Sequence, residues 1–271
     1  MFLLIDKPKG ITSHDVIDRI RKITDIRRTG HAGTLDPNAT GLLIVGVGRE
    51  STKELWTKFG KMDKTYVAEI TLGEERETDD SVGKIRNSNI EIRNGSAKLT
   101  ILSSSMDKSQ FSKSQMLKTL NLFLGEQMQT PPIYSAIKSG GKKAYEEARK
   151  GKVLKVEPRK VTIYSIKLLE YEAPQFNNRN NISTPPHGEE NPSEAKFSLA
   201  KGDEYPIIRI ETKVSSGTYI RALARDIGRK LGCGAYLSNL RRIKIGEYKV
   251  ENSVKLDELT EDNLDRKFNV L

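Results

Sequence analysis

The chain has 271 residues, of which 36% are hydrophobic, so it can bury one substantial core in a single large domain or in one with a small appendage. Its net charge of +10 favours a polyanionic partner without identifying one. The chain has one cysteine, so no internal disulfide is expected, and no cluster of cysteines and histidines has the spacing of zinc ligands, so no structural metal is expected. No apolar stretch approaches the roughly 18 residues of a membrane span. We therefore expect a cytoplasmic globular protein.

The N-terminal segment predicts a strand, a turn and a helix. Phe2 to Ile5 is apolar and is followed by the basic turn Lys7 to Gly10. Thr12 or Ser13 can then cap a helix whose buried face would hold Val16, Ile17, Ile20 and Ile23. Arg27 and Arg28 come next, and a solvated surface explains them as well as a function does.

Residues 30–41 form the most unusual stretch of the chain. Three glycines, His31 and the carboxylate of Asp36 lie within twelve residues, and Pro37 follows the acid directly. Composition alone is typical of a turn. Asp36 is nevertheless the one carboxylate positioned by glycines, so the stretch is either a connector or a site.

The next elements look like scaffold. Leu42 to Val47 predicts a buried strand, and Ser51 with Glu54 predicts a capping box at the start of a short helix carrying Leu55 and Phe59 inward. Lys64 to Gly73 alternates as a half-buried strand does, with Tyr66, Ala68, Ile70 and Leu72 on one face. By pattern alone Tyr66 is a core residue.

An acidic loop and a helix follow. Asp79 and Asp80 lie between Thr78 and Gly83, and adjacent carboxylates could hold a divalent metal. Residues 84–105 predict a loop or weak hairpin. A helix is expected from about residue 112 to 124, ending at Gly125 and burying Met116, Leu117, Leu120 and Phe123.

The middle of the chain is strongly basic. Residues 138–160 contain nine lysines and arginines against three glutamates, a density suited to phosphate contacts, although a charged surface helix would look the same. Val161 to Leu169 predicts a strand. Residues 172–204 are rich in asparagine and proline and poor in apolar residues, so we expect a mobile insertion there.

Regular structure is expected again near the C-terminus. Ile207 to Ile210 predicts a strand, and a helix closed by Gly232 should bury Ile220, Leu223, Ala224, Ile227 and Leu231. Three arginines repeat every four residues along it, as they would on a solvated face: Arg221, Arg225 and Arg229. Cys233 follows and is expected to be a small core residue.

Taken in order, several groups of residues resemble the TruB family of tRNA pseudouridine-55 synthases. Residues 30–41 are similar, nearly letter for letter, to the family's catalytic loop. The other matching groups are Lys7 to Ser13, Lys64 with Tyr66, Thr78 to Gly83, Gln129 to Gly151, and Ser215 to Arg242. The resemblance extends from Lys7 to about Leu259.

The resemblance implies roles for single residues. Asp36 falls on the nucleophile, Tyr66 on the ring that stacks on a flipped target base, and Arg221 on the arginine that pairs with the catalytic aspartate. The remaining matches fall on base-pocket or RNA-contacting positions: His31, Lys7, Lys9, Asp80, Tyr134, Lys138, Arg149, Tyr219 and Leu240. Isomerising uridine involves no redox step, so no cofactor is implied. The sequence leaves open whether Asp36 attacks C6 or C1′ and which group accepts the C5 proton.

The implied fold is α+β, with a mixed, mostly antiparallel central β-sheet flanked by helices and loops. Residues 1–250 would form the catalytic domain, in which 138–160 is a thumb-like insertion that folds over the RNA. Residues 251–271 would be a short tail without room for the PUA-type RNA-binding domain of many bacterial members. The expected partner is tRNA, through its T arm and T loop, bound by a monomer that needs no protein partner.

Other classes of protein remain open on sequence grounds. A metal-dependent nuclease could use Asp36, Asp79 and Asp80, and chelation would abolish its activity. A non-catalytic RNA chaperone would keep its function after Asp36→Asn. A third possibility is the catalytic subunit of a guide-RNA particle, a class related to the same family.

Overall fold

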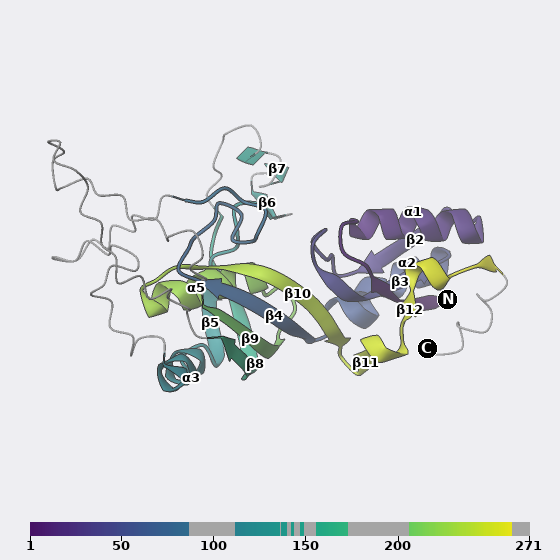
Figure 1. The fold of residues 1–271 in the computed structure, drawn as a ribbon. Coiled ribbons are helices and arrows are strands. Elements are labelled where there is room, and N and C mark those ends of the chain that lie inside the picture. Colours follow the sequence, from purple (N-terminus) through teal and green to yellow (C-terminus); the bar gives the residue numbers. More distant parts are fainter. Residues whose placement is uncertain are drawn as a thin grey trace, which may run out of the picture.

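A computed structural model describes residues 1–86, 112–135, 137–139, 142–143, 147–148, 156–172 and 206–261 (Figure 1). The strands are β1 (Phe2–Lys7), β2 (Thr29–Ala32), β3 (Thr40–Val47), β4 (Lys64–Leu72), β5 (Gly125–Gln129), β6 (Lys138–Ser139), β7 (Lys142–Lys143), β8 (Arg159–Glu172), β9 (Ile207–Val214), β10 (Ala235–Ile245), β11 (Tyr248–Lys249) and β12 (Val254–Lys255). The helices are α1 (Ser13–Thr24), α2 (Arg49–Leu55), α3 (Lys113–Asn121) and α5 (Ile220–Leu231), with the π-helical turn η1 (Trp56–Gly60) and the 3₁₀ turns η4 (Val250–Asn252) and η5 (Leu256–Glu258).

Ten of the described strands form one continuous sheet. The order is β12-β1-β3-β10-β4-β9-β8-β5, while β2 pairs with β3 and β11 with β10. Only the β1–β12 and β3–β10 pairs are parallel among these described neighbours. The predicted α+β class with a mixed, mostly antiparallel sheet is confirmed.

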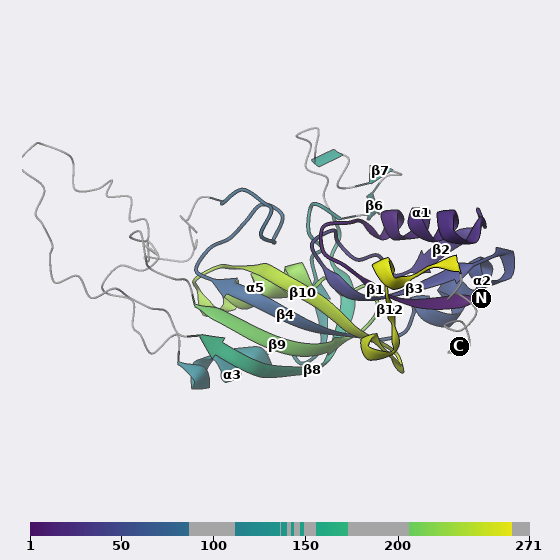
Figure 2. The same cartoon turned by 45° about the vertical axis from the view of Figure 1, so that its right-hand side comes forward.

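Strand β10 joins the two halves of the sheet. It pairs with β3 at Arg241 and Arg242 and with β4 along most of its length. Figures 1 and 2 show β1, β2 and β3 with α1 and α2 on one side of this seam, and β4, β8 and β9 with α3 and α5 on the other. Elements distant in sequence therefore meet along β10.

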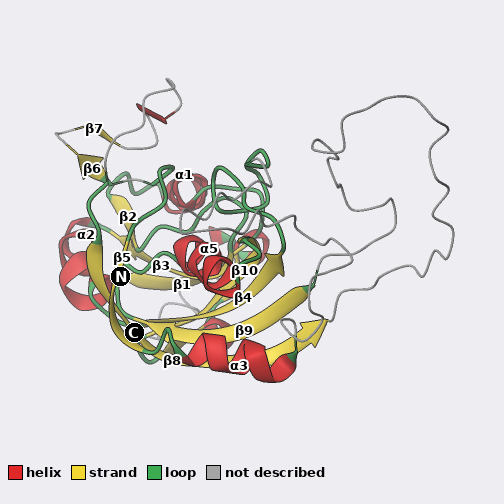
Figure 3. Cartoon of the chain, turned by 90° about the vertical axis from the view of Figure 1, so that its left-hand side faces the viewer, coloured by secondary structure: helices red, strands yellow, loops and turns green. Residues whose placement is uncertain are grey.

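Separate hydrophobic clusters stabilise the two halves. Strands β1 and β3 are buried on both faces, since Ile5 and Val45 pack under α1 while Leu4 and Ile44 face α2 and η1. This double burial explains their uninterrupted apolar sequences. In the other half, α5 packs against β10 and β4, and α3 adds Met116 to the same cluster (Figure 3).

The helix ends agree in part with the sequence signals. Thr12 caps α1 and forms a reciprocal capping box with Asp15, and Gly232 ends α5 with φ of +79°. The capping box predicted at Ser51 is wrong. Helix α2 begins at Arg49, after Gly48, so Ser51 lies inside it and its hydroxyl contacts the N-terminal amine.

Other differences follow from tertiary pairing. Strands β2, β5 and β10 had no sequence prediction, and the expected loop 30–41 is a strand at each end. Helix α3 ends at Asn121 because the chain turns there into β5, and Leu117, expected inside, is 42% exposed. Residues 87–105 and 173–204 lie outside the described part. Among the described helices, none is long and apolar enough to cross a membrane.

Candidate active site

Asp36 lies in the connection between β2 and β3, and its neighbours on both sides are fixed. Leu35 is buried, its N–H donates to Oγ of Ser13 at 2.9 Å, and its carbonyl accepts from the same hydroxyl at 3.1 Å. The carbonyl of Asp36 accepts from the N–H of Ala39 at 3.0 Å, closing a turn. The Asp36 side chain remains 43% exposed. The backbone is therefore rigidly held while the carboxylate stays accessible.

Lys7 holds the same turn from beneath. Its Nζ donates to the carbonyl oxygens of Pro8 at 2.8 Å, Ile11 at 2.7 Å and Pro37 at 3.2 Å. Burial lowers the pKa of Lys7 to about 8, and the nearby Asp36 carboxylate opposes that shift. The prediction that Lys7 contacts RNA is wrong, because the residue is 0% exposed and its donors are used within the protein. Lys7 positions the loop instead.

Arg242 secures both ends of the loop and was not singled out as functional in the sequence. The residue is 1% exposed, and its guanidinium donates to the carbonyls of Gly33 at 2.9 Å and Leu42 at 2.7 Å. A Cβ at Gly41, where φ is +101°, would lie 2.3 Å from the Arg242 carbonyl oxygen. Glycine is required there because β3 and β10 approach so closely.

Arg221 reaches Asp36 from the first turn of α5. Its Nε lies 3.0 Å from Oδ2 of Asp36, and its Nη2 lies 3.4 Å from Oδ1. The same guanidinium donates to the carbonyls of Thr78 at 2.9 Å and Tyr134 at 3.0 Å. Its side chain is 7% exposed. The predicted contact between Arg221 and Asp36 is therefore present, and the cation approaches the carboxylate from the protein side.

Asp80 is the second carboxylate beside Arg221. Its Oδ2 lies 3.6 Å from Nη1 of Arg221, and its Oδ1 accepts from the Thr78 hydroxyl at 2.6 Å and the Val82 N–H at 3.1 Å. These contacts make Asp80 a support for Arg221. Within the described residues, no group of three or more His, Cys, Asp or Glu residues is arranged to hold a metal ion.

The other arginines of α5 each pair with a carboxylate, and Arg225 is buried while Arg229 is 49% exposed. Nη1 of Arg225 lies 2.9 Å from Oδ2 of Asp79, and both side chains are more than nine-tenths buried. Arg229 pairs with Glu75 at 2.7 Å. Burial raises the pKa of Asp79, and Arg225 opposes that shift. The repeat of arginines every four residues suggested a solvated helix face, but residues 73–80 place a carboxylate beside each of these arginines.

Three residues were predicted to line the base pocket: Tyr66, Leu240 and Tyr219. Tyr66 and Leu240 are 7% and 9% exposed and belong to the same hydrophobic cluster as Leu35. Tyr219 precedes Ile220, and the Gln129 side chain accepts from its N–H at 2.8 Å and donates to its carbonyl at 3.1 Å. Burial raises the pKa of Tyr219. Gln129 is thus a further positioning residue, which its place in a matching sequence group could have indicated.

The remaining predicted RNA contacts differ in their surroundings. His31 lies on β2 with Nδ1 buried and without a hydrogen-bond partner, and burial lowers its pKa. Lys9 is exposed, whereas Tyr134 is half-buried and contacts Arg221 through its carbonyl. Lys138 begins β6, and Arg149 lies outside the described residues.

Comparisons with known proteins agree on one relationship. Residues 21–184 match the family model of the TruB family pseudouridylate synthase N-terminal domain, and residues 221–267 match that of the tRNA pseudouridylate synthase B C-terminal domain. The tRNA pseudouridine synthase B of Desulfotalea psychrophila is 38% identical over 97% of this chain and 89% of its own length. The tRNA pseudouridine synthase B of Aquifex aeolicus is 38% identical over 94% of this chain and 72% of its own length.

Solved structures show the same fold. A Cbf5-Nop10-Gar1 complex contains a chain that matches 98% of this one and 57% of its own length, with a TM-score of 0.60 and 24% identity. An archaeal box H/ACA sRNP Nop10-Cbf5 complex matches with a TM-score of 0.56 and 22% identity over the same 98%. At these identities the likeness concerns the fold alone.

Proposed function

The chain belongs to the TruB family of pseudouridylate synthases, and we propose that it converts the T-loop uridine at position 55 of tRNA to pseudouridine with Asp36 as nucleophile. The observation that carries this proposal is the Asp36–Arg221 pair, which joins residues 185 positions apart. Relatives named tRNA pseudouridine synthase B support the reaction and the substrate class.

The reaction makes few chemical demands beyond one positioned carboxylate. The N1–C1′ bond breaks, a C5–C1′ bond forms, C5 loses a proton and N1 gains one, so nothing is oxidised or reduced. Attack by Asp36 on C6 or on C1′ would each give a covalent intermediate. Arg221 contacts the acid from the buried side, so the 43% exposed carboxylate can face the base.

The target base must leave its stack to reach Asp36. Tyr66 and Leu240 supply apolar surface beside Leu35, the residue before the nucleophile. Tyr219 lies close enough to Asp36 and Arg221 for their charges to act on its phenol. We assign these three side chains to the walls of the pocket for the flipped uracil.

Release of tritium from a tRNA transcript containing 5-tritiated uridine tests the proposal directly. Asp36→Asn should lower the rate by at least about 1,000-fold, because removing a nucleophile removes the covalent path. Asp25→Asn is the matched control, since Asp25 is exposed and asparagine tolerates its left-handed backbone (φ 51°). Normal tritium release by folded Asp36→Asn would refute the role of Asp36.

We also propose that the protein acts as a monomer without an obligatory protein partner. The bacterial relatives named tRNA pseudouridine synthase B support a standalone enzyme, whereas the structural neighbours are named as complexes. Light scattering of the purified, active protein checks this. A dimer, or activity that requires an added protein, would contradict it.

A further inference from the structure

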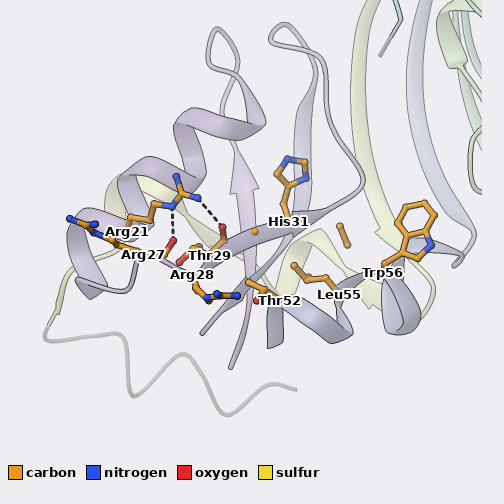
Figure 4. Close-up of a pocket in the computed structure, with 10 residues that line it drawn as sticks. Arg21, Arg27, Arg28, Thr29, His31, Thr52, Leu55 and Trp56 are labelled. Atoms are coloured by element: carbon orange, nitrogen blue, oxygen red, sulfur yellow. Dashed lines mark hydrogen bonds between the residues drawn. The ribbon is translucent and has the colours of Figure 1, made fainter. Parts of the chain in front are cut away.

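A cavity of about 480 Å³ lies beside the proposed active site and does not include Asp36. Figure 4 shows it between α1, β2 and α2. Its lining residues are Arg21, Arg27, Arg28, Thr29, Gly30, His31, Ala32, Thr52, Leu55 and Trp56. The volume falls within the range of about 300 to 1,000 Å³ typical of ligand sites. We name it the arginine–tryptophan pocket.

The charge of this pocket is positive and unbalanced. Three arginines line it, and the ten lining residues include no carboxylate. Arg27 and Arg28 are exposed, and within the described residues neither side chain forms an ion pair. Arg21 is fixed by Asp18 at 2.9 Å and by the carbonyls of Arg27 and Thr29. This arrangement suits a phosphate.

Trp56 supplies an aromatic surface at the other end of the pocket (Figure 4). The side chain is 63% exposed, yet its indole is held against Gly60, where a Cβ would lie 2.5 Å from the ring. His31 lines the pocket between the arginines and Trp56, with its Nδ1 unpaired. An open aromatic ring and unpaired cations that line one pocket form the combination that binds unpaired nucleotides.

We propose that the arginine–tryptophan pocket binds single-stranded nucleotides of the RNA substrate other than the target uridine. A phosphate lies against Arg27 and Arg28, and a base stacks on Trp56. The inference rests on the proposed function, because it takes the RNA that Asp36 modifies as the ligand. His31 connects the two sites, since it is five residues before Asp36 on the strand that leads to it.

Trp56 is the sole tryptophan, so its fluorescence reports on this pocket alone. The full chain carrying Asp36→Asn is titrated with a tRNA transcript, and Trp56 emission is compared with the anisotropy of labelled tRNA. We expect quenching that saturates with the Kd given by anisotropy. Unchanged emission when anisotropy shows saturation, or no RNA binding at all, overturns the inference. Equal quenching by 5′-UMP at the same concentration overturns the assignment to RNA.

Variants test the contacts separately. Trp56→Ala should weaken RNA binding by about 5-fold to 100-fold, and Trp56→Phe should restore most of that loss because it retains a ring for stacking. Arg28→Ala should weaken binding by about threefold to tenfold. Arg19→Ala is the matched control, since Arg19 is exposed on α1 and does not line the pocket. An equal effect at Arg19 and Arg28, or none at Trp56, overturns the inference.

Failure of this inference is distinguishable from failure of the proposed function. If wild-type protein releases tritium but Trp56 emission does not respond to bound RNA, the pocket is wrong and the function stands. If Trp56 is quenched by tRNA but no pseudouridine forms, the pocket stands and the function is wrong.

Discussion

Two groups of three arginines, one along α5 and one in the arginine–tryptophan pocket, differ in how far nearby carboxylates neutralise them. Along α5, Arg221, Arg225 and Arg229 each pair with a carboxylate at 3.0 Å or less. In the arginine–tryptophan pocket, Arg27 and Arg28 form no ion pair with any described residue. The arginines of α5 are neutralised within the protein, whereas Arg27 and Arg28 of the pocket are free to bind an anion; Arg21, the third arginine of the pocket, is paired with Asp18.

The difference shows why net charge says little about where RNA binds. A buried arginine that faces a carboxylate adds nothing to the field outside the protein, whereas an exposed unpaired one attracts phosphate. The charge of +10 is therefore informative only after each cation has been assigned a partner. Substituting members of the two groups should accordingly affect different measurements.

Removing one partner of the buried Arg225–Asp79 pair should have the largest effect. Arg225→Ala leaves Asp79 buried and unpaired, so the free energy of unfolding should fall by about 3 to 5 kcal/mol. Arg229→Ala is the matched control, because its side chain is 49% exposed, and should cost less than about 1 kcal/mol. Urea denaturation measures both.

A double variant distinguishes the effect of losing the ion pair from the effect of leaving the Asp79 carboxylate buried without a partner. Arg225→Met with Asp79→Asn removes both charges, and asparagine suits the left-handed backbone of Asp79 (φ 60°). Much of the stability should return. If the double variant is as unstable as Arg225→Ala, the stranded carboxylate is not the cause.

Arg221→Lys should impair catalysis while leaving the charge in place. Lysine cannot contact Asp36 and the Thr78 and Tyr134 carbonyls together, so the carboxylate would lose its fixed position. We expect kcat to fall by about 100-fold with little change in KM, measured by tritium release. A wild-type kcat would show that charge alone, without the fork geometry, is what Asp36 needs.

The sequence predicted most of this arrangement where the signal is local. Hydrophobic periodicity located β1, β3, β4, α1 and α5, and the order of residues 30–41 singled out Asp36 as the proposed nucleophile. Partnerships across the chain were harder to predict. Arg225 looked solvent-facing because nothing in α5 reveals that Asp79, 146 residues earlier, folds back against it.

Buried cations were the commonest source of error. Lys7 and Arg242 are polar in sequence, but each is buried because backbone carbonyls accept its hydrogen bonds. Strand β10 was missed for the same reason, since Arg242 interrupts its apolar pattern. The pocket at Trp56 carried no motif and became visible only from the positions of α1, β2 and α2.

The salt dependence of RNA binding should separate the two groups of arginines. The double variant Arg27→Ala with Arg28→Ala should reduce the steepness of log affinity against log salt by about 1 to 2. With fewer phosphate contacts, fewer counterions are released when the RNA binds. Arg229→Ala should leave that slope unchanged, since Glu75 already neutralises Arg229. Equal slopes for the wild type and the double variant would contradict the distinction.

Buried lysines form a third group of cations. Unlike an arginine, a buried lysine can lose its charge as the pH rises. Lys64 is 6% exposed and donates to the carbonyls of Gly60 at 3.2 Å and Met62 at 2.6 Å. Burial, together with a smaller effect of the nearby Arg242, which cannot lose its proton, lowers the pKa of Lys64 from 10.5 to about 8. Between about pH 8 and 10.5 the unfolded chain therefore binds more protons at this position than the folded one.

The sign of the effect on stability follows from this difference. The Lys64 contribution to the free energy of unfolding increases as pH rises through that window, because the folded protein no longer holds a desolvated charge. Lys64→Met should remove this increase, so urea denaturation from pH 7.5 to 9 should give a slope lower by no more than about 1 kcal/mol per pH unit. Burial raises the pKa of the Cys233 thiol to about 12, which lowers stability above pH 9 in both proteins and cancels in the comparison. Lys61→Met, at an exposed position, is the control, and an identical slope for Lys64→Met and wild type would mean that Lys64 remains protonated in the folded protein.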